Sequence, residues 1–194
     1  MSAFRLIAAA TLVAASTAAW AQQNTNIRGT VSAFDGKVIT IKSNAGQDVS
    51  VDMPENVVPS ITKAFTMADV KPGMKLGVTT IKRGDQTIAI DVRPISAQAP
   101  EGLSDYDLQP QSTMTNAIAD AVVTATGGNE ITLNYKTGVV KVLVLPGTPM
   151  SQAAPGQRAD VKAGETIFVA ARNEGGKLTA VRVQVSKDGV KPTQ

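Results

Sequence analysis

The chain has 194 residues, no cysteine, no histidine and a formal net charge of only +3. Without these two side chains it cannot form a disulfide, a Ser-His-Asp or Cys-His catalytic group, or the usual zinc, copper(II) and haem sites. Lys and Arg are scattered singly along the sequence, so the charge does not indicate a nucleic-acid-binding or membrane-binding surface.

The first 21 residues have the pattern of a secretory signal peptide. Arg5 precedes an apolar run over residues 6–15, and a small-x-small site follows at Ala19-Trp20-Ala21. The run is too short to span a bilayer, which takes about 20 apolar residues, and no later stretch is longer. We therefore expect export, cleavage after Ala21, and a periplasmic protein without a membrane span.

The remaining chain contains an internal repeat. Ile39-Thr40-Ile41 corresponds to Ile131-Thr132-Leu133, 92 residues later, and residues 89–92 correspond to residues 180–183, 91 residues later. A single one-residue deletion therefore aligns the two halves. We expect two β-domains, residues 22–94 and 114–186, joined by a polar linker, 95–113, and followed by a C-terminal tail, 187–194.

Apolar alternation predicts five strands in each repeat. Three strands, a connection and two strands is the element order of an OB-type barrel. The predicted fold is all-β, with two tandem five-stranded OB-like small barrels or rolled sheets. In chain order, the expected core residues are Ile27, Val31 and Ala33; Ile39 and Ile41; Leu76 and Val78; Ile88, Ile90 and Val92; then Ala119, Ala121, Val123 and Ala125; Ile131 and Leu133; Ile167 and Val169; Val181 and Val183.

Each repeat is near the lower size limit for a lone core, so we expect the two units to pack together. The predicted strand Val139–Leu145 is apolar on both faces, unlike its counterpart Asp48–Met53. This strand either marks the interface between the two units or is a core strand with more apolar residues than its counterpart. The linker is too polar to form core, and connections of its length are either linkers or functional loops.

Several segments resemble an uncharacterised proteobacterial envelope family, whose members are built from tandem β-rich domains of unknown function. The resemblance covers essentially the whole mature chain. Some relatives are automatically labelled as metal-transport proteins, and they often carry His and Trp in the loop between the repeats, where this chain has neither. The segments that carry the resemblance are Gly29-Thr30-Val31, Asp35-Gly36, Ile39–Ser43, Asp69–Gly73, Ser112–Ala117 and Leu178–Val183.

The candidate ligand-binding residues are aromatic or acidic. Tyr135, at the end of the second strand of its repeat, and Phe168, off the core face of a strand, are the positions where a small barrel could offer a stacking platform. Covering a neighbouring strand is the alternative role for both rings. Asp105, Tyr106 and Asp107 lie in the central loop, where the two carboxylates are either weak Ca²⁺ ligands or part of a solvated acidic loop.

These observations predict neither a catalytic residue nor a bound metal or cofactor. The favoured function is a non-enzymatic periplasmic binding or accessory module that contacts an envelope protein or a cell-wall component. The alternative is a solute- or metal-binding accessory of a transport system.

Overall fold

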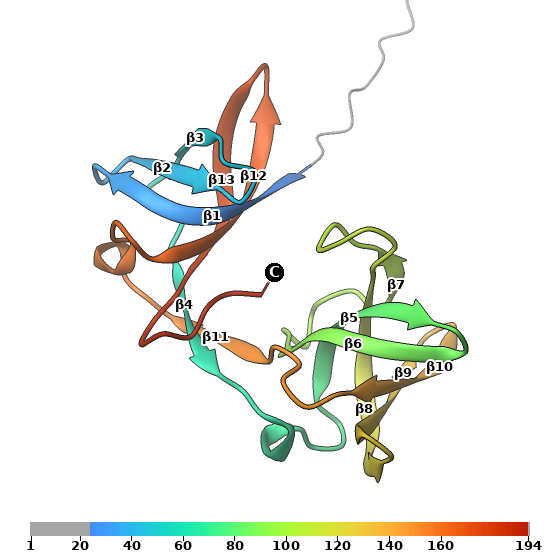
Figure 1. Ribbon diagram of the computed structural model, residues 1–194. Coiled ribbons are helices and arrows are strands. Elements are labelled where there is room, and N and C mark those ends of the chain that lie inside the picture. The colour runs from blue at the N-terminus through green and yellow to red at the C-terminus, as the bar shows by residue number, and fades with distance from the viewer. Residues whose placement is uncertain (1–23, 194) are drawn as a thin grey trace, which may run out of the picture.

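A computed structural model describes residues 24–193 of the chain (Figure 1). The predicted signal peptide and its cleavage site lie outside these residues. No helix in the described part is long and apolar enough to cross a membrane. The elements are β1 (Asn24–Phe34), β2 (Val38–Ser43), β3 (Asp48–Asp52), β4 (Ser60–Ala64), β5 (Lys75–Arg83), β6 (Gln86–Pro94), β7 (Gly102–Asp105), β8 (Thr113–Ala125), β9 (Gly128–Tyr135), β10 (Gly138–Val144), β11 (Ser151–Pro155), β12 (Thr166–Glu174) and β13 (Lys177–Val185), with short 3₁₀ helices at Met67–Asp69 and Arg158–Asp160.

The strands form two sheets, and each sheet curls into a ring of five strands (Figure 1). The first barrel contains β1, β2, β3, β12 and β13, and a parallel contact between Asp52 and Thr179 closes it. The second barrel contains β8, β9, β10, β5 and β6. It is closed by the pairing of β5 with β8 and by a parallel contact between Leu143 and Ile88. The prediction of an all-β fold is confirmed.

Each barrel is built from both repeats. β5 and β6 of the first repeat complete the second barrel, and β12 and β13 of the second repeat complete the first. The prediction that residues 22–94 and 114–186 form separate domains is therefore corrected. The strands of a barrel pair in the same way whether its last two strands come from its own repeat or from the other one. The pattern of apolar residues in the strands therefore does not reveal that the two repeats exchange these strands.

The exchange passes through β4 and β11, which lie between the barrels and pair with each other in antiparallel fashion (Figure 1). Ser60 pairs with Pro155, Ala64 pairs with Ser151, and Thr62 pairs with Ala153, its own equivalent in the repeat. The pairing pattern therefore has an approximate twofold symmetry centred on Thr62. An extended strand at this position carries the chain away from its own repeat instead of turning it back.

Each barrel has its own apolar core, and each core draws on both repeats. The alternation of apolar residues correctly predicted most of these positions. The first core includes Val31, Ile39, Ile41, Val51, Ile167, Val169 and Val183, and the second includes Leu76, Val78, Val92, Ala119, Ile131, Leu133 and Val142.

β-Bulges correct the alternation at six predicted core positions. The β5–β6 ladder skips Ile90, and the β12–β13 ladder skips the equivalent Val181, which is 41% exposed. The irregularity in β1 likewise leaves Ala33 exposed, and the one in β8 shifts Ala121, Val123 and Ala125 off the core face and leaves Val123 exposed. One extra residue in a strand reverses the face of every side chain beyond it, so these residues point away from the core.

The predicted polar linker and tail are partly ordered against the barrels. Gly102–Asp105 forms β7, which pairs with β8, and the following loop returns to β8 at Thr113. The tail crosses to the second barrel, where the Thr193 hydroxyl donates a hydrogen bond to Asp91. These segments therefore belong to the packed molecule.

Candidate functional site

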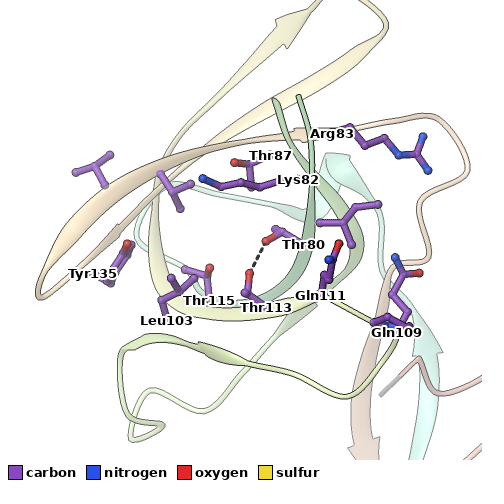
Figure 2. A pocket seen from close by; sticks show the side chains of 14 residues that line it. Thr80, Lys82, Arg83, Thr87, Leu103, Gln109, Gln111, Thr113, Thr115 and Tyr135 are labelled. Atoms are coloured by element: carbon purple, nitrogen blue, oxygen red, sulfur yellow. Dashed lines mark hydrogen bonds between the residues drawn. The ribbon is translucent and has the colours of Figure 1, made fainter. Parts of the chain in front are cut away.

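One end of the second barrel opens into a cavity of about 600 Å³ (Figure 2). The residues that form its walls occupy the inward-facing positions that follow the core residues along each strand. These wall residues are Thr80 of β5, Thr87 of β6, Thr113 and Thr115 of β8, Tyr135 of β9 and Val140 of β10. The cavity is therefore the mouth of the second barrel, and strands of both repeats build it.

The floor of the mouth is formed by threonines. Thr80 and Thr115 are buried, and the hydroxyl groups of Thr80 and Thr113 are hydrogen-bonded to each other at 3.0 Å. A hydroxyl group can donate one hydrogen bond and accept two, so this pair retains capacity for a further partner. The floor can thus bind a polar group at the end of a cavity that is otherwise partly apolar.

A lysine and apolar side chains surround the opening. The Lys82 side chain lies across the ring of strands, whereas Arg83 points away from it (Figure 2). Among residues 24–193, no carboxylate lies within ion-pair distance of Lys82. Leu103 and Val139 line the same opening and are 55% and 61% exposed. The mouth therefore combines the Lys82 ammonium group, with Arg83 at its edge, and uncovered apolar surface.

The central loop forms one side of the mouth through Gln109, Pro110 and Gln111. Gln111 has a φ of +62°, a conformation that side-chain-bearing residues rarely adopt. The loop is held in this shape by the Ser112 hydroxyl, which bonds to the carbonyl oxygens of Tyr106 and Gln109 at 2.8 Å each. Backbone strain of this kind is common where a side chain is presented to a ligand.

The corresponding positions of the first barrel carry different side chains. Ala171 replaces Thr80, Asn173 replaces Lys82 and Ser43 replaces Tyr135. The lysine and the tyrosine therefore belong to one mouth and are not general features of the repeat.

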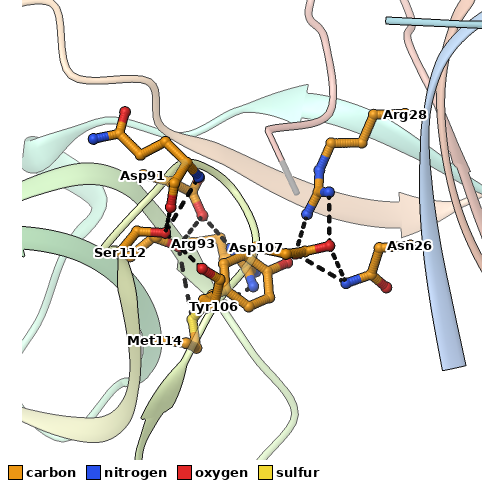
Figure 3. A network of polar contacts seen from close by, with 10 residues as sticks. Asn26, Arg28, Asp91, Arg93, Tyr106, Asp107, Ser112 and Met114 are labelled. Atoms are coloured by element: carbon orange, nitrogen blue, oxygen red, sulfur yellow. Dashed lines mark hydrogen bonds and ion pairs between the residues drawn. The ribbon is translucent and has the colours of Figure 1, made fainter. Parts of the chain in front are cut away.

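Two other candidate residues, Tyr106 and Asp107, lie beside Asn26 and Arg28 of β1 (Figure 3). Asp107 accepts two hydrogen bonds from the Arg28 guanidinium, at 2.8 and 3.1 Å, and also accepts from Asn26. Arg28 lies over the rings of Tyr106 and Phe168, 5.7 and 5.5 Å from their centroids. The hydrogen bonds from Arg28 lower the pKa of Asp107.

This arrangement changes the interpretation of three predicted residues. Phe168 is 3% exposed and covered by Arg28, so it offers no open stacking surface. Asp107 forms an ion pair with Arg28, and Asp105 is exposed at the end of β7. Glu101, a further acidic residue of the linker, pairs with Lys75 at 3.2 Å. Within the described residues, no group of three or more potential metal ligands comes together.

A buried ion pair between Asp91 and Arg93 connects β6 to the same region. The Arg93 guanidinium lies over the Tyr106 ring, 5.9 Å from its centroid, and the Asp91 carboxylate also accepts a hydrogen bond from the Thr193 hydroxyl. Burial raises the pKa of Asp91, an effect that Arg93 opposes. The sequence carries a signal for this pair, because Asp91 and Arg93 stand at alternate positions of an otherwise apolar strand, but it was not among the predicted site residues.

Comparison with known protein families, curated proteins and solved structures found no match to this chain. Its function is therefore inferred from the chemistry of its own cavities.

Proposed function

We propose that the protein is a non-enzymatic binding module, exported to the bacterial envelope, whose ligand site is the mouth of the second barrel. The observation that carries this proposal is one cavity of about 600 Å³ that combines a threonine floor, an apolar rim and an ammonium group with no carboxylate partner in the described part of the chain. Mouths of β-barrels are frequent ligand sites, and this volume is within the range of small-molecule pockets.

The lining favours a small amphipathic anion as the ligand. The Lys82 ammonium would pair with an acidic group, and the Thr80 and Thr113 hydroxyls offer hydrogen bonds deeper in the cavity. Tyr135, Leu103 and Val139 would cover an apolar body. A source in the envelope or the cell wall agrees with the predicted signal peptide.

Two features support a binding role without catalysis. The chain has no histidine or cysteine to serve as a base or nucleophile. The hydrogen bond of the Thr80 hydroxyl is to another hydroxyl, which cannot act as an effective general base. A solute-binding accessory of a transport system is the second candidate, because a cavity of this size suits a small solute.

Two fluorescent dyes test the site. Anilinonaphthalene sulfonate has an apolar body and one anionic group, and N-phenylnaphthylamine has a similar body without the charge. Both should bind saturably to the wild-type protein. Lys82→Ala should weaken sulfonate dye binding about tenfold, as expected for loss of one charge-assisted contact, and leave the neutral dye unchanged.

Two further variants control this experiment. Val139→Asp should weaken both dyes, because it places a carboxylate at the apolar rim. Lys63→Ala removes an exposed lysine of β4 that does not line the mouth and should change neither. Absence of saturable binding, or equal affinity of the sulfonate dye for wild type and Lys82→Ala, would reject the proposed site.

A further inference from the structure

A second cavity, of about 800 Å³, lies between the two barrels. The first barrel contributes Asn26 and Arg182, the second contributes Arg93 and Asn116, and the linker contributes Tyr106. We call this cavity the inter-barrel cleft. It shares no lining residue with the mouth of the second barrel.

Three arginines meet two carboxylates at the inter-barrel cleft. Arg28 pairs with Asp107, and Arg93 pairs with Asp91. Among the residues that the structure describes, no carboxylate pairs with Arg182, whose side chain donates to the Gln184 amide oxygen at 3.3 Å. The Arg182 guanidinium lies 5.7 Å from the centroid of the Phe168 ring, which fixes its position on the first barrel.

The internal repeat explains the excess cation. Arg182 and Gln184 of β13 occupy the positions of Asp91 and Arg93 in β6. In the first repeat the two positions carry an acid and a base that neutralise each other. In the second repeat they carry a base and an amide, so Arg182 faces the cleft without a paired carboxylate among residues 24–193.

The surroundings of Arg182 favour an incoming anion. Arg182 is exposed at the edge of the cleft, and partial desolvation together with the positive charge of Arg93 lowers the pKa of its guanidinium, which stays protonated at neutral pH. An anion bound here would offset the repulsion between Arg182 and Arg93. Neutral donors line the same space: Asn116 has a second amide hydrogen beyond the one it donates to the Pro100 carbonyl oxygen, and Ser104 contributes a hydroxyl group.

We propose that the inter-barrel cleft is an oxyanion-binding site, with Arg182 as the group that pairs with a carboxylate or phosphate of a small polar ligand. Arginine is suited to this role because its planar fork can bind two oxygens of one oxyanion. The site would be separate from the mouth of the second barrel, and it would connect the barrels through the bound ligand.

Calorimetric titration with inorganic phosphate and with succinate, at constant ionic strength, tests the site and distinguishes the two oxyanions. At least one of them should bind the wild-type protein in the micromolar to millimolar range. Arg182→Gln should weaken that binding at least about tenfold, and Arg182→Lys should weaken it less. Arg172→Gln is the matched control, because Arg172 is an exposed arginine of β12 outside the cleft that pairs with Glu174.

Protein stability provides a second readout. Arg182→Gln should change the melting temperature of the free protein little, because Arg182 is exposed and pairs with no carboxylate among residues 24–193, but it should abolish the rise that the bound oxyanion produces in the wild type. Lys82→Ala should leave oxyanion binding unchanged, so this proposal and the dye site can fail independently. Lack of binding by both oxyanions, or unchanged binding in Arg182→Gln, would overturn the proposal.

Discussion

At the scale of single residues, Asp107 illustrates how the central loop is held in place. Its carboxylate joins the loop to β1 through Arg28 and Asn26. The loop that the sequence presents as an acidic, solvated linker is therefore attached to the first barrel by an ion pair. The same loop lines the mouth of the second barrel through Gln109 and Gln111, so this contact also positions the proposed ligand site.

Asp107→Asn should destabilise the protein at neutral pH by up to about 1 kcal/mol, the range of partly exposed ion pairs. The folded-state pKa of Asp107 is lowered, so its stabilisation is present above the ordinary aspartate pKa of about 3.9 and is lost as the pH falls through the lowered value. Urea midpoints of wild type and variant should therefore differ at pH 7 and converge below about pH 3. Asp105→Asn, at an exposed position, should show no such difference.

Leu76→Asp should destabilise the protein severely. Leu76 is fully buried in the core of the second barrel, and an unpaired charge there costs several kcal/mol. Leu103→Asp provides a control, because Leu103 is exposed. Thermal melting followed by circular dichroism should show a large decrease in melting temperature for Leu76→Asp and little change for Leu103→Asp. If Leu76→Asp melted at the same temperature as the wild type, Leu76 would lie at the surface.

The sequence predicted part of the candidate site, namely Tyr135. It did not single out Lys82, because a lysine near a turn usually extends into solvent. Lys82 continues the inward-facing series of Leu76, Val78 and Thr80, but only the assembled barrel shows that this end is an open cavity. The arginines between the barrels were missed for a related reason, since their partners come from different barrels and from the linker.

At the scale of elements, β4 and β11 are the segments that determine the connectivity. Thr62 of β4 is buried, donates a hydrogen bond to the Val185 carbonyl oxygen at 2.8 Å, and accepts one from the Gln184 amide at 3.1 Å. Both partners lie in β13, at the end of the first barrel. These contacts fix β4 beside a strand of the other repeat.

Thr62→Val should therefore lower the free energy of unfolding by about 1–3 kcal/mol, because it removes the hydroxyl group that forms hydrogen bonds with two buried groups of β13. Thr124→Val, at an exposed position of β8, should have little effect. Urea denaturation of both variants measures the difference. Equal midpoints would indicate that the contacts of Thr62 do not hold β4 in place.

Most strands could be predicted from apolar alternation, since a strand with one face in a core must alternate. The bulges at Ile90 and Val181 could not, because a single extra residue has no compositional signature. Strand β7 was also missed, because Gly102–Asp105 is too polar to resemble a strand and forms by pairing with the edge of β8.

At the scale of the whole molecule, the exchange of strands makes the two barrels interdependent. The repeat was visible in the sequence, but the exchange was not, because an exchanged and an unexchanged arrangement make the same kinds of contact inside each barrel. They differ only in the path of the connecting strands. Since each core contains residues from both repeats, we expect a single cooperative unfolding transition.

The direct test of this architecture is cleavage of the chain between the repeats. A protease site inserted between Ala97 and Gln98, in an exposed turn of the linker, would separate the first repeat from the second. After cutting, the two fragments should elute together at the mass of the intact protein in native gel filtration and separate only in denaturant. Two folded fragments that elute apart under native conditions would show that each repeat closes its own barrel and would contradict the exchange.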